Sequence, residues 1–520
     1  MSTVTNLAKN LTDTTRAHAG RVAVRVDNAA MTYRALDDAS ARVAGLLHER
    51  GLKPGDRVGI MMPNVAEVPV AYYGVLRAGG VVVPMNPLLK AREVAYYLGD
   101  SGAGLIFAWH AFADQARAGA EQAEAKSIVV DAVGFPDLLA SATPDFQVAD
   151  AGDDDTAVIL YTSGTTGHPK GAELTHGNLI SNTEVTRTDV VRAGPDDVIF
   201  GGLPLFHVFG QTVALNVAVA AGACLTLLPR FDAEHALRII AGHRVTVFEG
   251  VPTMYVALIH APDRADYDTS SLRLCISGGA ALPVEVLRGF EEAFAVPVLE
   301  GYGLSETSPV ASFNLPGRER KPGSIGTPIR DVQMRVVDKE DHELPQGEVG
   351  EIVIRGPNVM KGYWQRPEAT AEAVKGAGEV GGGWFHTGDL ARVDSDGYFY
   401  IVDRKKDLII RGGYNIYPRE IEEVLYEHPA VAEAAVIGLP HPALGEEVGA
   451  AVALKPGAAA TAEELRDYVK GQVAAYKYPR HVWIMDALPK GATGKIQKRD
   501  IVIPADLAAS HLPGPPAAAP

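Results

Sequence analysis

Residues 161–171 read Tyr161-Thr-Ser-Gly-Thr-Thr-Gly-His-Pro-Lys170-Gly, and no other stretch of the chain is as informative about its fold. Between Thr162 and Lys170 it offers four hydroxyl side chains, two glycines and one lysine, a dense set of donors for a polyphosphate. We predict a strand before it, and Thr175 is a good N-cap for a helix that begins near His176. The stretch therefore predicts a phosphate-binding loop between a strand and a helix. A flexible surface loop is the plain alternative, which so dense a run disfavours.

Downstream of this loop, short β-branched runs alternate with helical segments. Thr246–Phe248, Leu272–Ser277 and Val296–Glu300 are predicted strands, and Pro283–Phe294 is a predicted helix. Such strand–helix–strand succession favours parallel sheets covered by helices. We therefore expect an α/β fold for the large N-terminal part of the chain.

The length of 520 residues requires at least two domains. After Lys321 the pattern changes to strands and tight turns, with a hairpin signal at Asp394–Gly397. Thr461 and Glu464 form a capping-box pattern in a smaller α+β unit near the C-terminus. We expect an N-terminal domain over residues 1–403, a C-terminal domain over 404–503 and an Ala/Pro-rich, disordered tail over 504–520.

Composition and charge exclude several classes of protein. A net charge of -16 argues against a nucleic-acid binder. The N-terminus lacks the apolar core of a signal peptide, and the most apolar stretch, Val213–Leu228, is short for a bilayer span and predicts a buried helix followed by a strand. Cys224 and Cys275 fall in apolar runs without a metal-ligand spacing, which predicts inert core thiols. We expect a cytoplasmic protein without an integral membrane segment.

Five motifs in order resemble those of the ANL superfamily of adenylate-forming enzymes, in its acyl-CoA synthetase branch. They are the loop at 161–171, Gly301-Tyr-Gly-Leu-Ser-Glu306-Thr, His386-Thr-Gly-Asp389, Asp403-Arg-Lys-Lys406-Asp and Pro489-Lys-Gly-Ala-Thr-Gly-Lys495. The resemblance extends to about Asp500, and Ser305 stands where the family usually has threonine. It implies helix-covered parallel sheets, a small β-barrel-like subdomain and a smaller, mobile α+β C-terminal domain.

The resemblance also implies a reaction in which ATP activates a carboxylic acid as an acyl-adenylate and coenzyme A accepts the acyl group. The site must neutralise anions and hold them in line. Glu306 is a hard ligand suited to Mg²⁺, Tyr302 offers a face for adenine, and Asp389 can accept from the ribose hydroxyls. The expected catalytic residues are Lys495, Glu306 and Arg404, with Glu306 as the metal ligand. The expected cofactor-binding residues are Thr162, Ser163, Gly164, Thr165, Thr166, Gly167, Lys170, Gly278, Ala280, Gly301, Tyr302, Gly303, Ser305, Asp389, Arg404, Gly412 and Gly413.

The segment Pro204-Leu-Phe-His207-Val-Phe-Gly210 resembles the family segment that borders the acyl pocket. We expect His207 to form the wall rather than to move a proton, because a carboxylate nucleophile is already ionised at pH 7. The expected substrate contacts are His207, Phe209, Gly210, Gln211, Val251, Gly279, Pro309 and Val310. These walls are mostly small or apolar, which favours a medium- or long-chain fatty acid, with an aryl acid of the cinnamate or coumarate type next.

Several alternatives concern the acceptor and the class of protein. No carrier domain follows the adenylation unit, which favours coenzyme A, and the Gly412-Gly413 turn resembles the family turn that lines the pantetheine tunnel. Lys406 resembles the hinge about which the C-terminal domain rotates. A stand-alone fatty-acyl-AMP ligase serving a separate carrier protein is the alternative, and a nucleotide-binding regulatory protein is the non-enzyme alternative. The presence of both Glu306 and Lys495 argues against the latter. A homodimer is compatible with the sequence.

Overall fold

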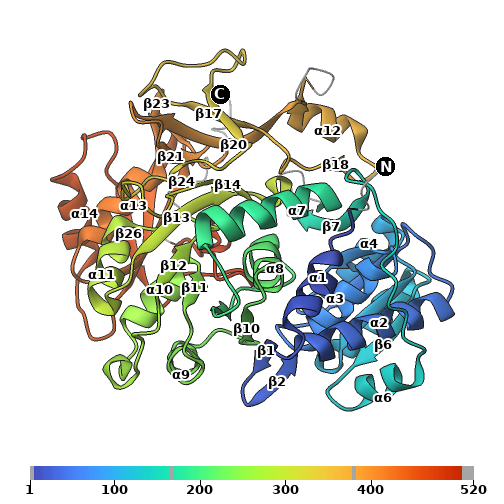
Figure 1. Ribbon diagram of the computed structural model, residues 1–520. Helices are drawn as coiled ribbons and strands as arrows, with labels where there is room; N and C mark the ends of the chain where they lie inside the picture. Colours follow the sequence, from blue (N-terminus) through green and yellow to red (C-terminus); the bar gives the residue numbers. More distant parts are fainter. Residues whose placement is uncertain (1–4, 163–168, 377–381, 506, 508–520) are drawn as a thin grey trace.

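The computed structural model describes residues 5–162, 169–376, 382–505 and 507, and it shows a mixed α/β protein built on two large sheets (Figure 1). The first sheet has nine strands in the order β15-β14-β13-β12-β11-β9-β10-β1-β2. The strands from β13 to β1 in this order are parallel, and antiparallel strands extend both ends. The bounds are β1 Val22–Val26, β2 Ala29–Thr32, β9 Val198–Gly201, β10 Cys224–Leu227, β11 Val247–Gly250, β12 Leu274–Ser277, β13 Val298–Gly303, β14 Val310–Phe313 and β15 Thr327–Pro328.

The second sheet has seven strands in the order β18-β8-β7-β4-β3-β5-β6. The bounds are β3 Arg57–Met61, β4 Val81–Pro84, β5 Leu105–Trp109, β6 Lys126–Val130, β7 Thr156–Thr162, β8 Lys170–Thr175 and β18 Gly362–Tyr363. Helices α2 (Tyr33–Glu49) and α3 (Glu67–Arg77) cover one face, and α4 (Ala91–Ser101) and α5 (Ala113–Gln122) cover the other. The predicted helix-covered parallel sheets are confirmed.

Helices lie on both faces of the nine-stranded sheet, and their placement follows from the strand order. The chain moves outward from β9 to β10 and then returns past β9 to β11, so right-handed connections place the intervening helices on opposite faces. One face carries α9 (Ala233–His243), α10 (Pro252–Ile259) and α11 (Val284–Phe294). The other carries the π-helix η3 (Gly210–Asn216) and α8 (Val217–Ala221), which pack beside α7 (His176–Val185) and α1 (Lys9–His18).

A five-stranded antiparallel sheet occupies the place of the expected barrel-like subdomain. Its strands are β16 Gln333–Val337, β17 Gly350–Arg355, β19 Val374–Lys375, β20 Trp384–Val393 and β21 Phe399–Arg404. Among the described strands the pairing runs β16-β17-β20-β19, with β21 beside β20. Strands β20 and β21 flank the turn at 394–397, so the predicted hairpin is confirmed.

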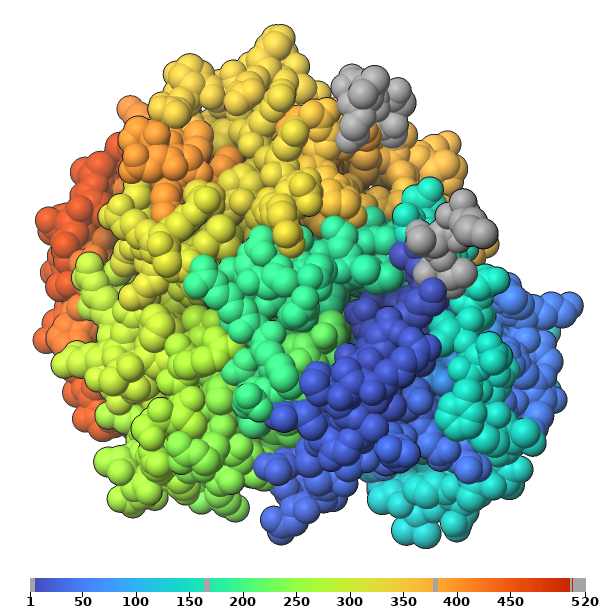
Figure 2. Space-filling model, viewed as in Figure 1, coloured from blue at the N-terminus to red at the C-terminus, as the bar shows by residue number. Residues whose placement is uncertain are grey.

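The C-terminal unit contains two helices and a second five-stranded sheet, whose strands are mostly antiparallel. Its elements are β22 Ile409–Arg411, β23 Tyr414–Ile416, α13 Pro418–Glu427, β24 Val431–His441, β25 Gly445–Leu454, α14 Ala462–Lys470 and β26 His481–Met485. The unit has a hydrophobic core of its own, and α13 packs against α11 of the large domain. Figure 2 shows these orange and red residues along one flank of the molecule. The remaining short elements are α6 Gly134–Ser141, α12 Pro367–Ala373, η1 His110–Phe112, η2 Thr186–Val191, η4 Arg264–Asp266, η5 Ser305–Thr307 and η6 Lys498–Asp500.

Side-chain caps set the predicted helix starts. The Thr175 hydroxyl accepts a hydrogen bond from the backbone N–H of Asn178, and the Thr461 hydroxyl accepts one from Glu464. In both helices the N3 side chain returns the bond, which completes a capping box. The predicted starts of α7 and α14 are confirmed.

The expected helix N-terminus at the phosphate-binding loop is wrong. Strand β8 separates the loop from α7. It pairs antiparallel with β7, and the aligned residues run from Thr156 opposite Thr175 to Thr162 opposite Lys170. The described ends of the loop, Thr162 and Lys170, therefore face each other in an antiparallel strand pair rather than preceding a helix. The physical reason is burial, since the backbone of β8 completes its hydrogen bonds with β7 while its apolar side chains enter the core.

The remaining predictions concern the most apolar stretch, the two cysteines, membrane-spanning helices and the C-terminal tail. The stretch from Val213 to Leu228 forms buried helix followed by strand β10, as predicted, and both cysteines are buried and unpaired. Burial raises the pKa of Cys224 to about 11, which is consistent with an inert thiol. None of the helices in the described ranges is long and apolar enough to cross a membrane. Most of the tail expected to be disordered, residues 506 and 508–520, lies outside the described residues, whereas Leu507 packs near Trp483.

Candidate active site

The loop that carries Lys495 docks against the large domain. The Thr253 hydroxyl, at the start of α10, donates a 2.8 Å hydrogen bond to the carbonyl of Gly494. A side chain at Gly494 would lie 3.1 Å from Val251 and from Thr253, and its φ is +78°, so this close approach requires glycine. The C-terminal unit thus delivers Lys495 to the end of the nine-stranded sheet, where β11 stops.

Four residues from distant segments meet where this loop docks. Burial, together with the positive charge of Arg404, lowers the pKa of Lys495 to about 8, and the nearby Asp389 acts in the opposite direction. Burial and the charge of Lys495 lower the pKa of His207 to about 4. His207 is therefore neutral at pH 7, which is consistent with the expected wall role. The motifs predicted four residues separately, and the structure brings them together: Lys495, Arg404, Asp389 and His207.

The lowered pKa of Lys495 predicts an alkaline limit to activity. The cationic form, which attracts the two anions, dominates below pH about 8 and is lost above it. We expect kcat/KM for adenylation, which reports the free enzyme, to fall about tenfold per pH unit above that value. A pH profile of pyrophosphate release at low ATP measures this limb.

Lys495→Arg is the matched control for the pH profile. A guanidinium stays charged to much higher pH than an ammonium, so its profile should be flat where the wild-type rate declines. His207 contributes nothing to this limb, because it is already neutral there. A wild-type profile that stays flat up to pH about 10 would contradict the assignment of the cation.

Asp389 is held by the other residues expected to bind nucleotide. The Tyr302 hydroxyl donates to Asp389 Oδ2 at 2.5 Å, and Arg404 Nε lies 3.3 Å from Oδ1. The side chain of Asp389 is 7% exposed, and its register partner across the β20–β21 hairpin is Arg404. Both carboxylate oxygens are thus positioned by a cation and a hydroxyl, an arrangement suited to accepting hydrogen bonds from a sugar diol.

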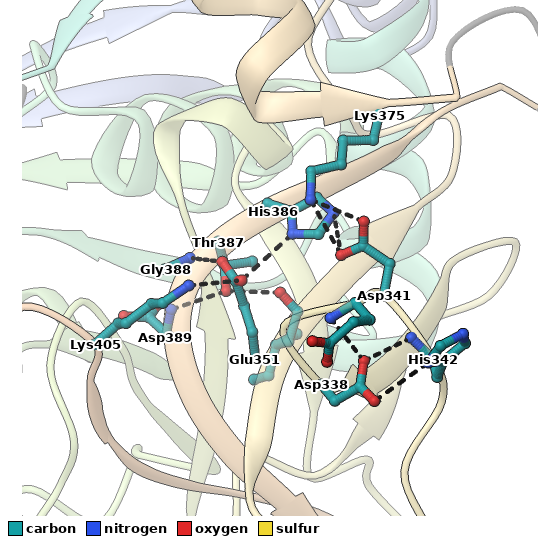
Figure 3. Close-up of polar contacts among 12 residues, drawn as sticks. Asp338, Asp341, His342, Glu351, Lys375, His386, Thr387, Gly388, Asp389 and Lys405 are labelled. Carbon is teal, nitrogen blue, oxygen red and sulfur yellow. Dashed lines mark hydrogen bonds and ion pairs between the residues drawn. The ribbon is translucent and has the colours of Figure 1, made fainter.

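Glu351, which the motifs did not predict, contacts the residue that precedes Asp389 (Figure 3). Its carboxylate accepts a 2.9 Å hydrogen bond from the N–H of Gly388 and lies 3.4 Å from His386 and 3.5 Å from Lys405. Burial acts to raise the pKa of Glu351, but these contacts outweigh it and lower the pKa to about 2. A permanently charged Glu351 therefore connects β17 to the segment before Asp389 and to the residue next to the expected hinge.

Glu306 lies near Lys170, at the end of the loop that is predicted to bind phosphate. Its carboxylate is nearly buried and accepts a 3.0 Å hydrogen bond from the hydroxyl of Tyr363. Lys170 Nζ lies 5.2 Å from the centroid of the same tyrosine ring, because β18 pairs with β8. Tyr363 joins two predicted residues, and no motif pointed to it.

Glu306 fits the expected Mg²⁺ in its chemistry. Burial raises the pKa of this carboxyl, so a cation beside it would stabilise the charged form. No cluster of three His, Cys, Asp or Glu side chains capable of holding a metal occurs in the described part of the chain. A site of one carboxylate with substrate phosphates and water is the usual way in which proteins bind Mg²⁺.

The phosphate-binding loop itself is only partly described. Thr162 and Lys170 lie at the ends of the paired strands β7 and β8, and the Thr162 hydroxyl lies 3.5 Å from the carbonyl of Lys170. The remaining residues expected to bind phosphate lie outside the described residues. They are Ser163, Gly164, Thr165, Thr166 and Gly167.

At the glycines predicted to approach nucleotide, close packing by other residues also disfavours a side chain. A side chain at Gly301 would meet the ring of Phe313 at 2.1 Å, and one at Gly303 would meet the carbonyl of Pro309 at 1.8 Å. Gly278 packs against the ring of Phe209. Ala280 and Ser305 are half-buried on the same side of the sheet, after β12 and β13 respectively. Nucleotide contact by this group remains a prediction.

The expected acyl wall is mostly buried and apolar. Phe209, Val251 and Val310 are at most 7% exposed, and Pro309 is buried as well. Gly210 and Gln211 begin η3, and π-helical turns are frequent at functional sites. Gly279 is exposed with a φ of +80°, and it faces Val251.

Two further expected groups, the Gly412–Gly413 turn and Lys406, are exposed in this structure. Gly412 and Gly413 form the exposed turn between β22 and β23, where the Gly412 N–H donates to the carbonyl of Leu444. Lys406 is exposed between β21 and β22, and its charge contributes to the lowered pKa of Lys495. Next to it the buried Asp403 accepts hydrogen bonds from the N–H groups of Arg404 and Arg419, which joins the hinge segment to α13.

Comparisons with known proteins give consistent matches. The family model described as AMP-binding enzyme matches residues 11–364, and the AMP-binding enzyme C-terminal domain matches residues 420–495. A long-chain-fatty-acid–CoA ligase of Bacillus subtilis is 39% identical, with 95% of this chain and 93% of the relative covered. A feruloyl-CoA synthase of an Amycolatopsis species is also 39% identical, with 92% and 95% covered. ATP-bound MatB from Rhodopseudomonas palustris superposes with a TM-score of 0.88 at 37% identity, covering 96% of this chain and 98% of its own.

Proposed function

This chain belongs to the family of AMP-binding enzymes and is an adenylate-forming acyl-CoA ligase, and from that premise we propose that it activates a medium- or long-chain fatty acid. The observation that carries the proposal is the meeting of Lys495, Arg404 and Asp389 beside an apolar wall that contains Phe209. The two cations would receive the carboxylate of the acid and the α-phosphate of ATP. Preorganised charges of this kind lower the barrier without moving during the reaction.

Each of the site residues would have a separate role in adenylation. Asp389, positioned by Tyr302, would hold the ribose, while Lys170 and the loop at 162–170 would hold the outer phosphates. Lys495 would neutralise the repulsion between the attacking carboxylate and the α-phosphate. Mg²⁺, held by Glu306, would shield phosphate charge when bound. The neutral His207 would close the pocket on the acyl side.

Coenzyme A is the proposed acceptor of the acyl group, in a second conformation. The Lys495 loop fills the space beside Val251 and Thr253, so a thiol needs that loop to leave. We propose that the C-terminal domain, residues 404–503, turns about Lys406 and brings the Gly412–Gly413 turn to the site.

An aryl acid is the second candidate substrate. The feruloyl-CoA synthase relative supports it as strongly in identity as the fatty-acid ligase does. A short wall of Val251, Gly279 and Phe209 suits a flat ring as well as a chain.

The product mixture tests the proposed reaction. Incubation with ATP, Mg²⁺, coenzyme A and a panel of fatty and aryl acids is expected to give AMP, pyrophosphate and the acyl-CoA, identified by chromatography. The acid with the highest kcat/KM decides between the two candidates. ADP as the nucleotide product, or no turnover with any acid, would contradict the proposal.

A further inference from the structure

Glu249, on β11, is a buried carboxyl group that the proposed mechanism does not use. It is 0% exposed, and neither of its oxygens has a hydrogen-bond partner among the described residues. Leaving a buried polar group unpaired is unfavourable, so such groups are rare and usually face a ligand or water. A solvated glutamate would carry no such cost, which makes this position informative.

The strand register shows which face of the sheet Glu249 occupies. Its neighbour Phe248 stacks on Phe200, with ring centroids 5.1 Å apart, and contacts Tyr255 of α10 edge-on. Side chains alternate along a strand, so Glu249 points to the opposite face. That face is covered by η3 and α8.

Val251, a residue of the predicted acyl wall, lies on the same face of the sheet as Glu249. Val251 lies two residues after Glu249, which places Glu249 roughly 7 Å farther from the Lys495 loop along the strand. Phe209, immediately before η3, packs at the end of the adjacent β12. Gln211 of η3 is also buried, and its amide oxygen has no partner in the described ranges. Glu249 and Gln211 are thus two buried residues near the predicted acyl wall that have unpaired oxygens.

We propose that Glu249 is a specificity-determining residue at the inner end of the acyl pocket, where it selects acids that carry a hydroxyl group distant from the carboxylate. This inference rests on the proposed function, since it concerns the acid that the enzyme activates. It narrows the substrate class to hydroxylated fatty or aryl acids.

The chemistry of the position favours a hydroxyl. Burial raises the pKa of Glu249 well above its ordinary value, which favours the neutral carboxylic acid. A neutral carboxyl donates one hydrogen bond and accepts others, and a hydroxyl does the same. A plain alkyl or phenyl end would leave both oxygens unpaired, and sites built to bind a hydroxyl discriminate strongly against analogues that lack it.

The wild-type enzyme provides the first test. Matched pairs of acids are compared by kcat/KM for pyrophosphate release: decanoate with ω-hydroxydecanoate, dodecanoate with ω-hydroxydodecanoate, and cinnamate with its para-hydroxy derivative. In at least one pair the hydroxy acid is expected to be favoured by on the order of 10- to 100-fold. The pair that shows the preference identifies the acid as fatty or aryl.

Variants then assign the preference to Glu249. Glu249→Met, of similar volume, is expected to reduce the ratio to about one or below, and Glu249→Gln, which can still donate and accept, should retain most of it. Glu300→Met is the matched control, because Glu300 is also buried with one unpaired oxygen but aligns with Ser277, on the opposite face from Glu249. Its ratio should equal that of the wild type.

The ratio of two acids on one sample does not depend on how much of that sample is folded, so destabilised variants remain informative. If the acid without the hydroxyl is preferred in every pair, the inference is wrong. The proposed ligase function would still hold. A hydroxyl preference that persists in Glu249→Met also overturns the inference, since Glu249 would then only hold buried water. Absence of AMP formation with every acid would instead reject the proposed function itself.

Discussion

Lys495→Ala is expected to slow acyl-adenylate formation by about 10²–10³, the usual loss for one preorganised electrostatic contact. The reaction joins two anions, and Lys495 is held beside Arg404 where they would meet. The docking bond from Thr253 to Gly494 involves backbone on one side, so it should survive the substitution. Single-turnover release of pyrophosphate measures the effect.

The second half-reaction is the internal control for this variant. Thioester formation from supplied acyl-AMP should continue near the wild-type rate, because attack by a thiol needs no lysine at that position. Lys495→Arg keeps the charge and should retain more adenylation than the alanine variant. Equal slowing of both half-reactions, or of neither, would remove the main support for a lysine that acts in adenylation alone.

Gly413→Trp is expected to have the opposite pattern, with adenylation preserved and thioester formation reduced by about 10²-fold or more. In the present conformation the turn is exposed, and among the described residues no atom beyond its chain neighbours lies within 4 Å of a Cβ placed on Gly413, so a side chain there begins in open space. After the proposed domain rotation the same turn would line a narrow path for the thiol, which an indole would obstruct. The two half-reactions are assayed separately by pyrophosphate release and by acyl-CoA formation.

Gly457→Trp is the matched control for the glycine variant. Gly413 and Gly457 have φ values of +86° and +76°, both lie in exposed turns of the C-terminal domain, and both have open space around a Cβ. The backbone strain of about 1–2 kcal/mol is therefore similar in the two variants. Gly457→Trp should leave both half-reactions unchanged, and a loss of thioester formation there would show that strain, rather than obstruction, explains the result.

Local patterns predicted the elements that short-range interactions determine. The caps at Thr175 and Thr461 and the hairpin turn at 394–397 depend on residues within four positions of one another, and all three are confirmed. The expectation that a helix N-terminus meets the phosphate-binding loop was wrong for the complementary reason, although the helix begins at His176 as predicted. Strand β8 exists because β7 offers it a complete set of partners, and pairing across a loop is not visible in local propensity.

The motifs were enough to predict the family and the class of reaction, because they concentrate rare combinations of glycine, hydroxyl and charged residues in short segments. Which side chains share a site became visible only in the folded chain. Tyr363 beside Glu306, Glu351 bonded to Gly388 and the buried Glu249 have no motif of their own. Their roles arise from strand pairing and burial, which change the pKa and the hydrogen-bonding needs of a carboxyl group through residues far away in the chain.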